Sequence, residues 1–249
     1  MGQAVCAFSR RGELIYRYLL FLPEGHPEGC KARGRGAKGC DAESRGTEGR
    51  RWPLILFLHG IGERGDDPEV LKAYGPPKWA SEHPEFPFVV ASPQCPASSH
   101  WVEGGGEIEK LHALLDEITS ACSVDPDRVY VTGLSMGGRG AWAMAIQRPE
   151  RFAAIAPVCG RSDPEKAYLL KDLPVWVFHG AKDEVVPLEK AEEMVNALRV
   201  CGGNVRFTVY PDAAHDAWTL TYGNPELYDW FLQHSKGKQG AGELRRAAR

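Results

Sequence analysis

The sequence of 249 residues has no long hydrophobic run. A membrane-spanning helix needs about 20 predominantly apolar residues, whereas the uninterrupted apolar runs are short, such as residues 54–58 and 175–178. The first residues also lack the apolar core of a secretory signal, because Arg10, Arg11 and Glu13 interrupt them. We therefore expect no membrane span, no secretory leader and a cytoplasmic location.

The sequence also lacks a C-x-x-C pair, and its seven cysteines are an odd number. Both features disfavour a disulfide framework and a zinc site. Cys30 and Cys40 share one glycine-rich segment, where they could oxidise together, although we expect them to stay reduced. No two histidines lie four residues apart beside an acid, so we predict no metal site.

The regular part of the sequence has no excess of basic charge, although the net charge of the whole chain is only −3. Residues 26–51 hold seven Lys/Arg and four Asp/Glu, and residues 236–249 hold five Lys/Arg and one Glu. A nucleic-acid-binding protein would carry such charge on a folded face, so we expect no nucleic-acid partner. Both segments are also poor in apolar residues. We predict a disordered insertion at 26–51, a disordered tail at 236–249 and one folded domain over 1–235.

Short apolar segments alternate with helical patterns along the rest of the chain. The expected strands are residues 13–22, 54–58, 88–91, 128–132, 153–158, 175–178 and 205–210. The expected helices are residues 108–122, 136–148, 188–199 and 225–233, and Asp125-Pro126-Asp127 is expected to form a turn. Near-continuous apolar strands are typical of a sheet that is covered on both faces. The pattern therefore predicts an α/β fold with a mainly parallel central sheet flanked by helices.

One motif in this pattern carries chemistry. Gly133-Leu134-Ser135-Met136-Gly137 fits G-x-S-x-G between an expected strand and an expected helix. In that setting a sharp turn lifts the serine hydroxyl above the edge of the sheet. The alternative is a glycine-rich turn with an incidental serine. We predict that Ser135 is a nucleophile.

A serine nucleophile needs a base, and the base needs an orienting acid. Asp183 and His215 each follow an expected strand, where open α/β sheets place functional groups. The chain order Ser135, Asp183, His215 is also the order expected for a strand–turn–helix nucleophile. We predict His215 as the base and Asp183 as the acid. Rival acids are Asp163, Glu184, Asp212 and Asp216.

Backbone amides are expected to stabilise the oxyanion. One should come from Met136, directly after the nucleophile, and the other from Ile61, in the glycine-containing loop after strand 54–58. His59 is expected to hold this loop rather than to act chemically. Trp101 and Trp218 are expected to line the substrate pocket, the alternative being simple packing.

These residues resemble the serine esterases of the α/β-hydrolase superfamily, and more narrowly the phospholipase/carboxylesterase group, in the branch labelled predicted peptidase or esterase. The resemblance covers most of residues 12–235. It rests on residues 58–65, 92–96, 132–138, 178–187 and 210–218. Dienelactone hydrolases share the fold but use a cysteine nucleophile, from which Ser135 departs.

The resemblance implies an α/β-hydrolase domain that hydrolyses carboxylic esters through an acyl-enzyme on Ser135, without a cofactor. Residues 159–174 are too few for a large cap domain, so we expect an open site and a preference for short-chain or small esters. The partner would be a small-molecule ester. Alternatives are a lysophospholipase or acyl thioesterase for longer chains, a serine peptidase, and a non-catalytic binding protein. The oligomeric state is not predicted.

Overall fold

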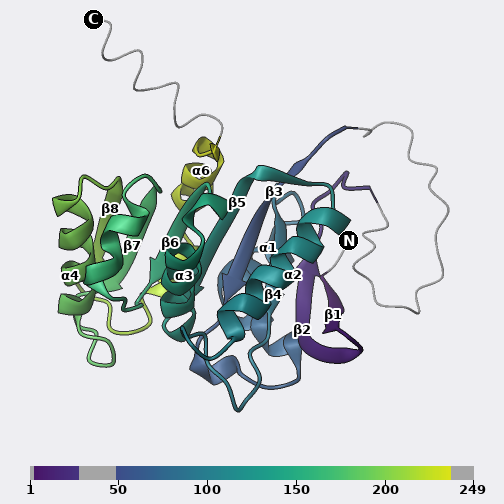
Figure 1. The fold of residues 1–249 in the computed structure, drawn as a ribbon, viewed down its shortest axis with the longest axis horizontal. Coiled ribbons are helices and arrows are strands. Elements are labelled where there is room, and N and C mark those ends of the chain that lie inside the picture. Colours follow the sequence, from purple (N-terminus) through teal and green to yellow (C-terminus); the bar gives the residue numbers. More distant parts are fainter. Residues whose placement is uncertain (1–2, 28–48, 237–249) are drawn as a thin grey trace, which may run out of the picture.

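The computed structural model describes residues 3–27 and 49–236 of the chain, which form an eight-stranded sheet with helices on both faces (Figure 1). The strand order is β1-β2-β4-β3-β5-β6-β7-β8. The strands are β1 (Ala4–Arg10), β2 (Glu13–Phe21), β3 (Trp52–Leu58), β4 (Val89–Pro93), β5 (Val124–Leu134), β6 (Ala154–Val158), β7 (Val175–Gly180) and β8 (Val205–Tyr210). From β4 to β8 all neighbours are parallel, whereas β1 and β2 join antiparallel.

The helices form two layers that enclose the sheet. They are α1 (Gly75–Glu82), α2 (Glu107–Ala121), α3 (Met136–Gln147), α4 (Leu188–Val200), α5 (Trp218–Tyr222) and α6 (Pro225–Gln233). Helices α2, α3 and α4 contribute to one hydrophobic core, and α1, α5 and α6 contribute to the other. Figure 1 shows α2, α3 and α4 in front of the sheet.

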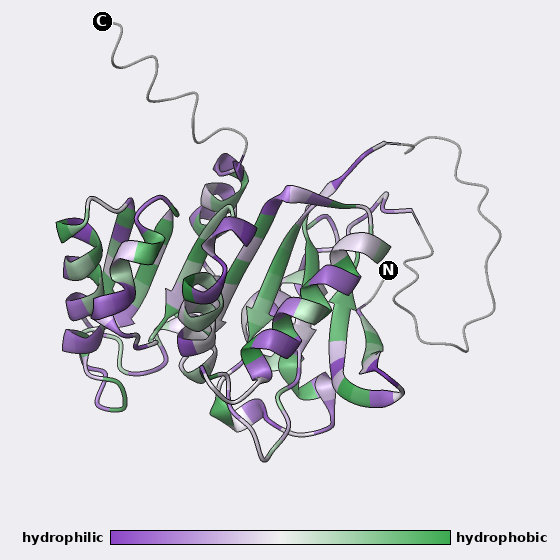
Figure 2. Ribbon diagram, in the orientation of Figure 1, coloured by the Kyte–Doolittle hydropathy of each residue, from purple (hydrophilic) through white to green (hydrophobic). Residues whose placement is uncertain are grey.

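Strand β3 shows how the sequence produces this arrangement. All seven of its residues are buried, which explains its uninterrupted apolar run. Successive side chains of a strand point to opposite faces, so Leu54, Leu56 and Leu58 enter the core beneath α2–α4 while Ile55 and Phe57 enter the other. Figure 2 shows the same concentration of hydrophobic residues along the central strands. Strand β8, at the sheet edge, differs because none of its residues is fully buried.

The predicted fold class is confirmed, including the absence of a large cap between β6 and β7, where only the short 3-10 helix Pro164–Leu170 lies. The sequence pattern missed β1 and α1. It also predicted a turn at 125–127, which lies within β5 beside a register shift. Among the described residues, no helix has the length and apolar character needed to cross a bilayer.

The predictions for the insertion and the tail largely fall outside the part of the chain that the structure describes. The structure does not describe residues 28–48, which include Cys30 and Cys40, or residues 237–249. His26, at the predicted start of the insertion, is described and is buried near the ring of Trp52, with the ring centroids 6.1 Å apart. The described part of the chain therefore includes the first residues of the predicted insertion, whose disorder stays a prediction.

Candidate active site

The functional candidates meet at the carboxyl edge of the parallel strands. His59 follows β3, Ser135 follows β5, Cys159 follows β6, Asp183 follows β7 and His215 follows β8. Parallel strands end at the same edge, and open α/β sheets bind ligands there. The topology therefore brings together residues that are as much as 156 positions apart, from residue 59 to residue 215.

Ser135 occupies a sharp turn between β5 and α3. Its φ of 52° and ψ of −112° are unusual for a residue with a side chain. The turn is held from two sides, because Ser135 N donates to Val158 O at 2.9 Å and α3 starts directly against β3. A Cβ at Gly137 would lie 1.8 Å from Leu58 O, so only glycine permits this approach. The strained conformation is thus built into the packing of three elements.

His215 lies in a loop that is fixed to the end of β7. Lys182 N donates to Ala213 O at 2.9 Å, and a Cβ at Gly180 would lie 2.1 Å from Ala214 O. His215 Nε2 is 2.8 Å from Ser135 Oγ, and its side chain remains 19% exposed. The imidazole is therefore in position to exchange a proton with the serine hydroxyl.

Asp183 orients this imidazole from its other side. Its Oδ2 lies 2.7 Å from His215 Nδ1, and its Oδ1 accepts the amides of Val185 and Val186, both at 2.9 Å. The Asp183 side chain is fully buried. The structure thus brings Ser135, His215 and Asp183, the residues predicted as nucleophile, base and acid, into one hydrogen-bonded chain.

The rival acids have other surroundings. Asp163 caps the helix that begins at Pro164, by accepting Glu165 N, and Asp212 forms an ion pair with Lys182. Glu184 is exposed, and Asp216 O accepts the amide of Thr219. None of the four carboxylates forms a hydrogen bond with His215 within the described residues.

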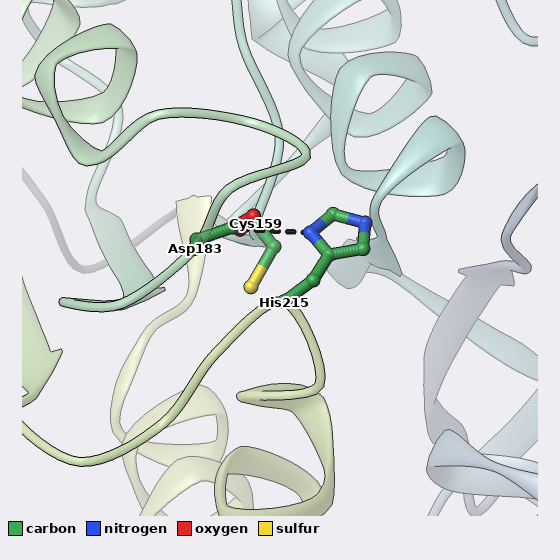
Figure 3. A group of neighbouring side chains, drawn as sticks. All are labelled: Cys159, Asp183 and His215. Carbon is green, nitrogen blue, oxygen red and sulfur yellow. Dashed lines mark hydrogen bonds and ion pairs between the residues drawn. The ribbon is translucent and has the colours of Figure 1, made fainter.

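Cys159 lies beside the Asp183–His215 pair (Figure 3), with one potential ligand atom of each residue within 4.8 Å of the others. Burial, reinforced by the negative charge of Asp183, raises the pKa of the Cys159 thiol to about 12. The thiol is therefore protonated at neutral pH. The Asp183 carboxylate is, in addition, already occupied by the hydrogen bonds described above.

The loop after β3 adjoins the nucleophile turn. A Cβ at Gly60 would lie 2.7 Å from Leu134 Cδ1, so the loop passes directly beside the residue before Ser135. His59 Nε2 accepts Cys95 N at 2.9 Å, and its Nδ1 lies 2.5 Å from Gly60 O. Burial lowers the pKa of His59 to about 4, so its ring is neutral and can make both bonds. These contacts hold the loop, in agreement with the role expected for His59.

Ile61 and Met136 both lie next to the nucleophile turn. Ile61 begins a 3-10 helix after Gly60, and Met136 begins α3 directly after Ser135. The assignment of their amides to an oxyanion hole stays a prediction.

The expectation that Trp101 lines the substrate pocket is wrong. Its side chain is fully buried and packs edge-on against Tyr16 and His59. It also covers Gly140 of α3, where a Cβ would lie 2.7 Å from Trp101 Cβ. Trp218, by contrast, is half-buried and packs edge-on against His215, with a centroid distance of 5.2 Å. Packing explains Trp101, whereas Trp218 remains next to the reacting groups.

Sequence reasoning gave no role to His179, the penultimate residue of β7. Its buried Nε2 lies 2.8 Å from Val186 O and 3.2 Å from Asp183 Oδ2. The sequence contains a signal for His179, because a histidine at the end of a fully buried strand directly precedes the loop of the predicted acid.

A pocket of about 250 Å³ flanks the first turns of α3. It is lined by Glu103, Arg139, Ala143, Arg161, Ser162 and Asp163. Arg139 N donates to Ser135 O at 3.0 Å, which places the pocket close to the nucleophile turn. Glu103 forms an ion pair with Lys166, whereas Arg139 and Arg161 are exposed and form no ion pair with any described residue.

The fold and the Ser–His–Asp arrangement define an α/β-hydrolase, which confirms the superfamily expected from the sequence. The model of the family described as "Dienelactone hydrolase family" matches residues 100–224, which is half of the chain. The chain belongs to this family. Ser135 therefore does not place it outside the dienelactone hydrolases, contrary to the expectation drawn from their cysteine nucleophile.

Individual relatives agree with this placement. A "Putative carboxymethylenebutenolidase" of Yersinia pestis is 33% identical over 131 residues, which cover 44% of this chain and 48% of the relative. A bifunctional acetylxylan esterase/xylanase of Neocallimastix patriciarum is 26% identical over 76% of this chain and 28% of the relative. The chain thus spans less than half the length of both. A solved structure described as a thermostable esterase has a TM-score of 0.74 at 30% identity, over 94% of this chain and 63% of that one.

Proposed function

We propose that the protein is a serine carboxylesterase that hydrolyses short-chain or small carboxylic esters through an acyl-enzyme on Ser135. The observation that carries the proposal is the hydrogen-bonded chain from Ser135 Oγ through His215 to Asp183, with distances of 2.8 and 2.7 Å. The relatives described as esterases support hydrolysis of the same class of bond.

The geometry supports two half-reactions. In the first, Ser135 Oγ attacks the ester carbonyl while His215 Nε2 takes the hydroxyl proton and then gives it to the leaving alcohol. In the second, His215 Nε2 takes a proton from water while the water oxygen attacks the acyl carbonyl, and it then gives that proton to Ser135 Oγ as the acyl–Oγ bond breaks and the acid leaves. Asp183 holds the imidazole in the tautomer with a proton on Nδ1 and stabilises its cation. These steps use protons already present on the chain and in water, and no cofactor takes part.

The proposed oxyanion hole consists of the Met136 and Ile61 amides. Amides that are fixed before the reaction stabilise the negative oxygen without reorganising. Both would be held by packing described above, Met136 by the start of α3 and Ile61 by the loop that His59 anchors. We expect each amide to contribute about 2.7–4 kcal/mol to transition-state stabilisation, as is typical for such donors.

The preference for small esters is supported by the short connection between β6 and β7 and by the surroundings of His215. Only the 3-10 helix Pro164–Leu170 lies where a cap would be inserted, and Trp218 offers one aromatic wall. An open site gains less than the roughly 0.8 kcal/mol per methylene of full burial. Longer acyl chains should therefore bring little benefit.

The pocket beside α3 favours a second class of substrate within the same reaction. The relative from Yersinia pestis is named for a butenolide, a cyclic ester, that carries a carboxymethylene group. Arg139 and Arg161 lack ion-pair partners within the described residues and line the pocket, and guanidinium groups bind carboxylates well. A lactone or ester with a carboxylate is therefore the second candidate.

The test is a kcat/KM series on p-nitrophenyl esters from acetyl to palmitoyl, together with a hemisuccinate ester that carries a carboxylate. Ser135→Ala and His215→Ala should each lower kcat by at least ~10³-fold with an unchanged Tm. Asp183→Asn should be severely impaired, whereas Asp163→Asn and Glu184→Gln should not. A steady rise of kcat/KM with chain length would favour a lysophospholipase or thioesterase. Inactivity on every ester would favour a serine peptidase if a fluorophosphonate still labels Ser135, and a binding protein if it does not.

The carboxylate candidate has its own control. Arg139→Ala and Arg161→Ala should lower kcat/KM for the hemisuccinate ester and leave that for the acetyl ester unchanged. Equal losses on both esters would contradict a carboxylate subsite.

A further inference from the structure

The carboxylate of Asp183 accepts more than the hydrogen bond from the base. Its Oδ1 accepts two backbone amides, those of Val185 and Val186. Its Oδ2 faces two imidazoles, with His215 Nδ1 at 2.7 Å and His179 Nε2 at 3.2 Å. Three of these groups form hydrogen bonds with the carboxylate, namely the two amides and His215, and His179 Nε2 makes a close contact with Oδ2 beside them.

The tautomer of His179 follows from its contacts. Its Nε2 lies 2.8 Å from Val186 O, and a carbonyl oxygen only accepts, so Nε2 carries the proton. The same nitrogen lies 3.2 Å from Asp183 Oδ2, so the positive end of its N–H dipole is close to the carboxylate. His179 Nδ1 is buried and has no hydrogen-bond partner among the described residues. His179 therefore donates through Nε2 alone.

We propose that His179 is a positioning residue that sets the basicity of His215 through Asp183. The inference rests on the proposed function, because it concerns the same base. His179 lies at the end of β7, the strand that leads into the Asp183 loop. By donating to Val186 O, it fixes the turn whose amides hold Oδ1. Its N–H dipole, with Nε2 3.2 Å from Oδ2, also offsets part of the negative charge on the oxygen that faces His215.

The direction of the effect follows from this charge sharing. Without the His179 N–H, more negative charge on Oδ2 faces His215, so the protonated form of His215 becomes more stable. The titratable groups near the pair are Cys159, protonated because burial raises its thiol pKa, the hydroxyl of Ser135 and the exposed carboxyl of Asp216. None of them is altered by a substitution of His179, so a difference between two His179 variants in the acidic limb of the pH–rate profile reports the contact of His179 with Asp183.

The experiment compares two amide variants of the full-length protein. His179→Gln places its amide nitrogen near the position of Nε2 and keeps the donor, whereas His179→Asn reaches only the position of Nδ1. The pH dependence of kcat/KM for p-nitrophenyl acetate is measured for both, with Tm as the control for folding. In His179→Asn we expect the acidic limb to move up by about 0.5 to 1 pH unit and kcat to fall roughly tenfold. In His179→Gln we expect a profile within about 0.2 unit of the wild type.

The outcomes separate this inference from the proposed function. An unchanged or downward-shifted limb in His179→Asn overturns the role of His179, even if Tm falls, because a merely structural residue changes stability and not the base. If His179→Asn does not fold, His179→Gln decides the inference. An upward shift of the acidic limb in His179→Gln, which keeps the donor, would overturn the role of His179. The proposed function fails separately, if Ser135→Ala retains wild-type activity.

Discussion

Replacing Gly180 with alanine adds one methyl group where β7 meets the loop that carries His215. The new Cβ would lie 2.1 Å from Ala214 O and 2.5 Å from Ala213 O. Real Cβ contacts are essentially never shorter than 3.0 Å, so the loop must retreat by about 0.9 Å. His215 directly follows Ala214 in the sequence, so it would move with the loop. Its 2.8 Å contact with Ser135 Oγ would then lengthen to the limit of a hydrogen bond.

A displacement of about 1 Å in a reacting group costs on the order of 10²-fold in rate. We therefore expect Gly180→Ala to lower kcat/KM for p-nitrophenyl acetate about 100-fold. Overpacking should also reduce stability by roughly 1–3 kcal/mol, which leaves the protein folded at 25 °C. Gly105→Ala is the matched control, because its nearest atom would be 3.8 Å away and the residue is exposed. If Gly180→Ala keeps kcat/KM within threefold of the wild type, the close approach of this loop does not position the base.

Two further predictions concern the buried side chains. Burial lowers the pKa values of His59 and His112 to about 4. In the unfolded chain both histidines are protonated below about pH 6.5. The free energy of unfolding should therefore fall as the pH is lowered from 6.5 to 4. Each histidine contributes about 3 kcal/mol to this loss, which can be measured by urea unfolding at pH 7 and pH 4.5. His112→Phe should remove the contribution of His112 and raise Tm, because neither ring nitrogen of His112 has a hydrogen-bond partner among the described residues. Trp101→Ala should lower the free energy of unfolding by about 3–5 kcal/mol in the same assay, because Trp101 is fully buried. A loss of activity without a loss of stability would instead show that Trp101 lines the substrate pocket.

Several features were predictable because they depend on local sequence. The central strands are buried on both faces, so they appear as uninterrupted apolar runs, as in β3 and β7. The serine turn can be recognised in the sequence from Gly133 and Gly137, because close packing requires glycine at both positions. Parallel topology then places the ends of β5, β7 and β8 at one edge, which is why the serine motif, the positions directly after expected strands and the chain order together pointed to Ser135, Asp183 and His215.

Other features depend on contacts between distant segments and leave weaker traces. Strand β1 buries only Cys6 and Phe8, so its short alternating pattern was not distinguished from a loop. Trp101 follows a loop segment in sequence, yet Tyr16 from β2 and Gly140 from α3 enclose it. No pattern near residue 101 reveals those partners. His179 has the hydrophobic surroundings of a core residue, and only the fold shows that its ring faces Asp183.

Strand β8 has a consequence for how the protein responds to heat. It is the edge strand of the parallel part of the sheet, with one neighbouring strand and no fully buried residue, and it leads directly into the loop of His215. Peripheral elements with few buried contacts open at a lower free energy than the core. The base therefore depends on the least protected strand, while Ser135 depends on β5 in the centre of the sheet. Warming should detach His215 from Ser135 before the sheet melts, so that activity is lost reversibly below the unfolding temperature and returns on cooling.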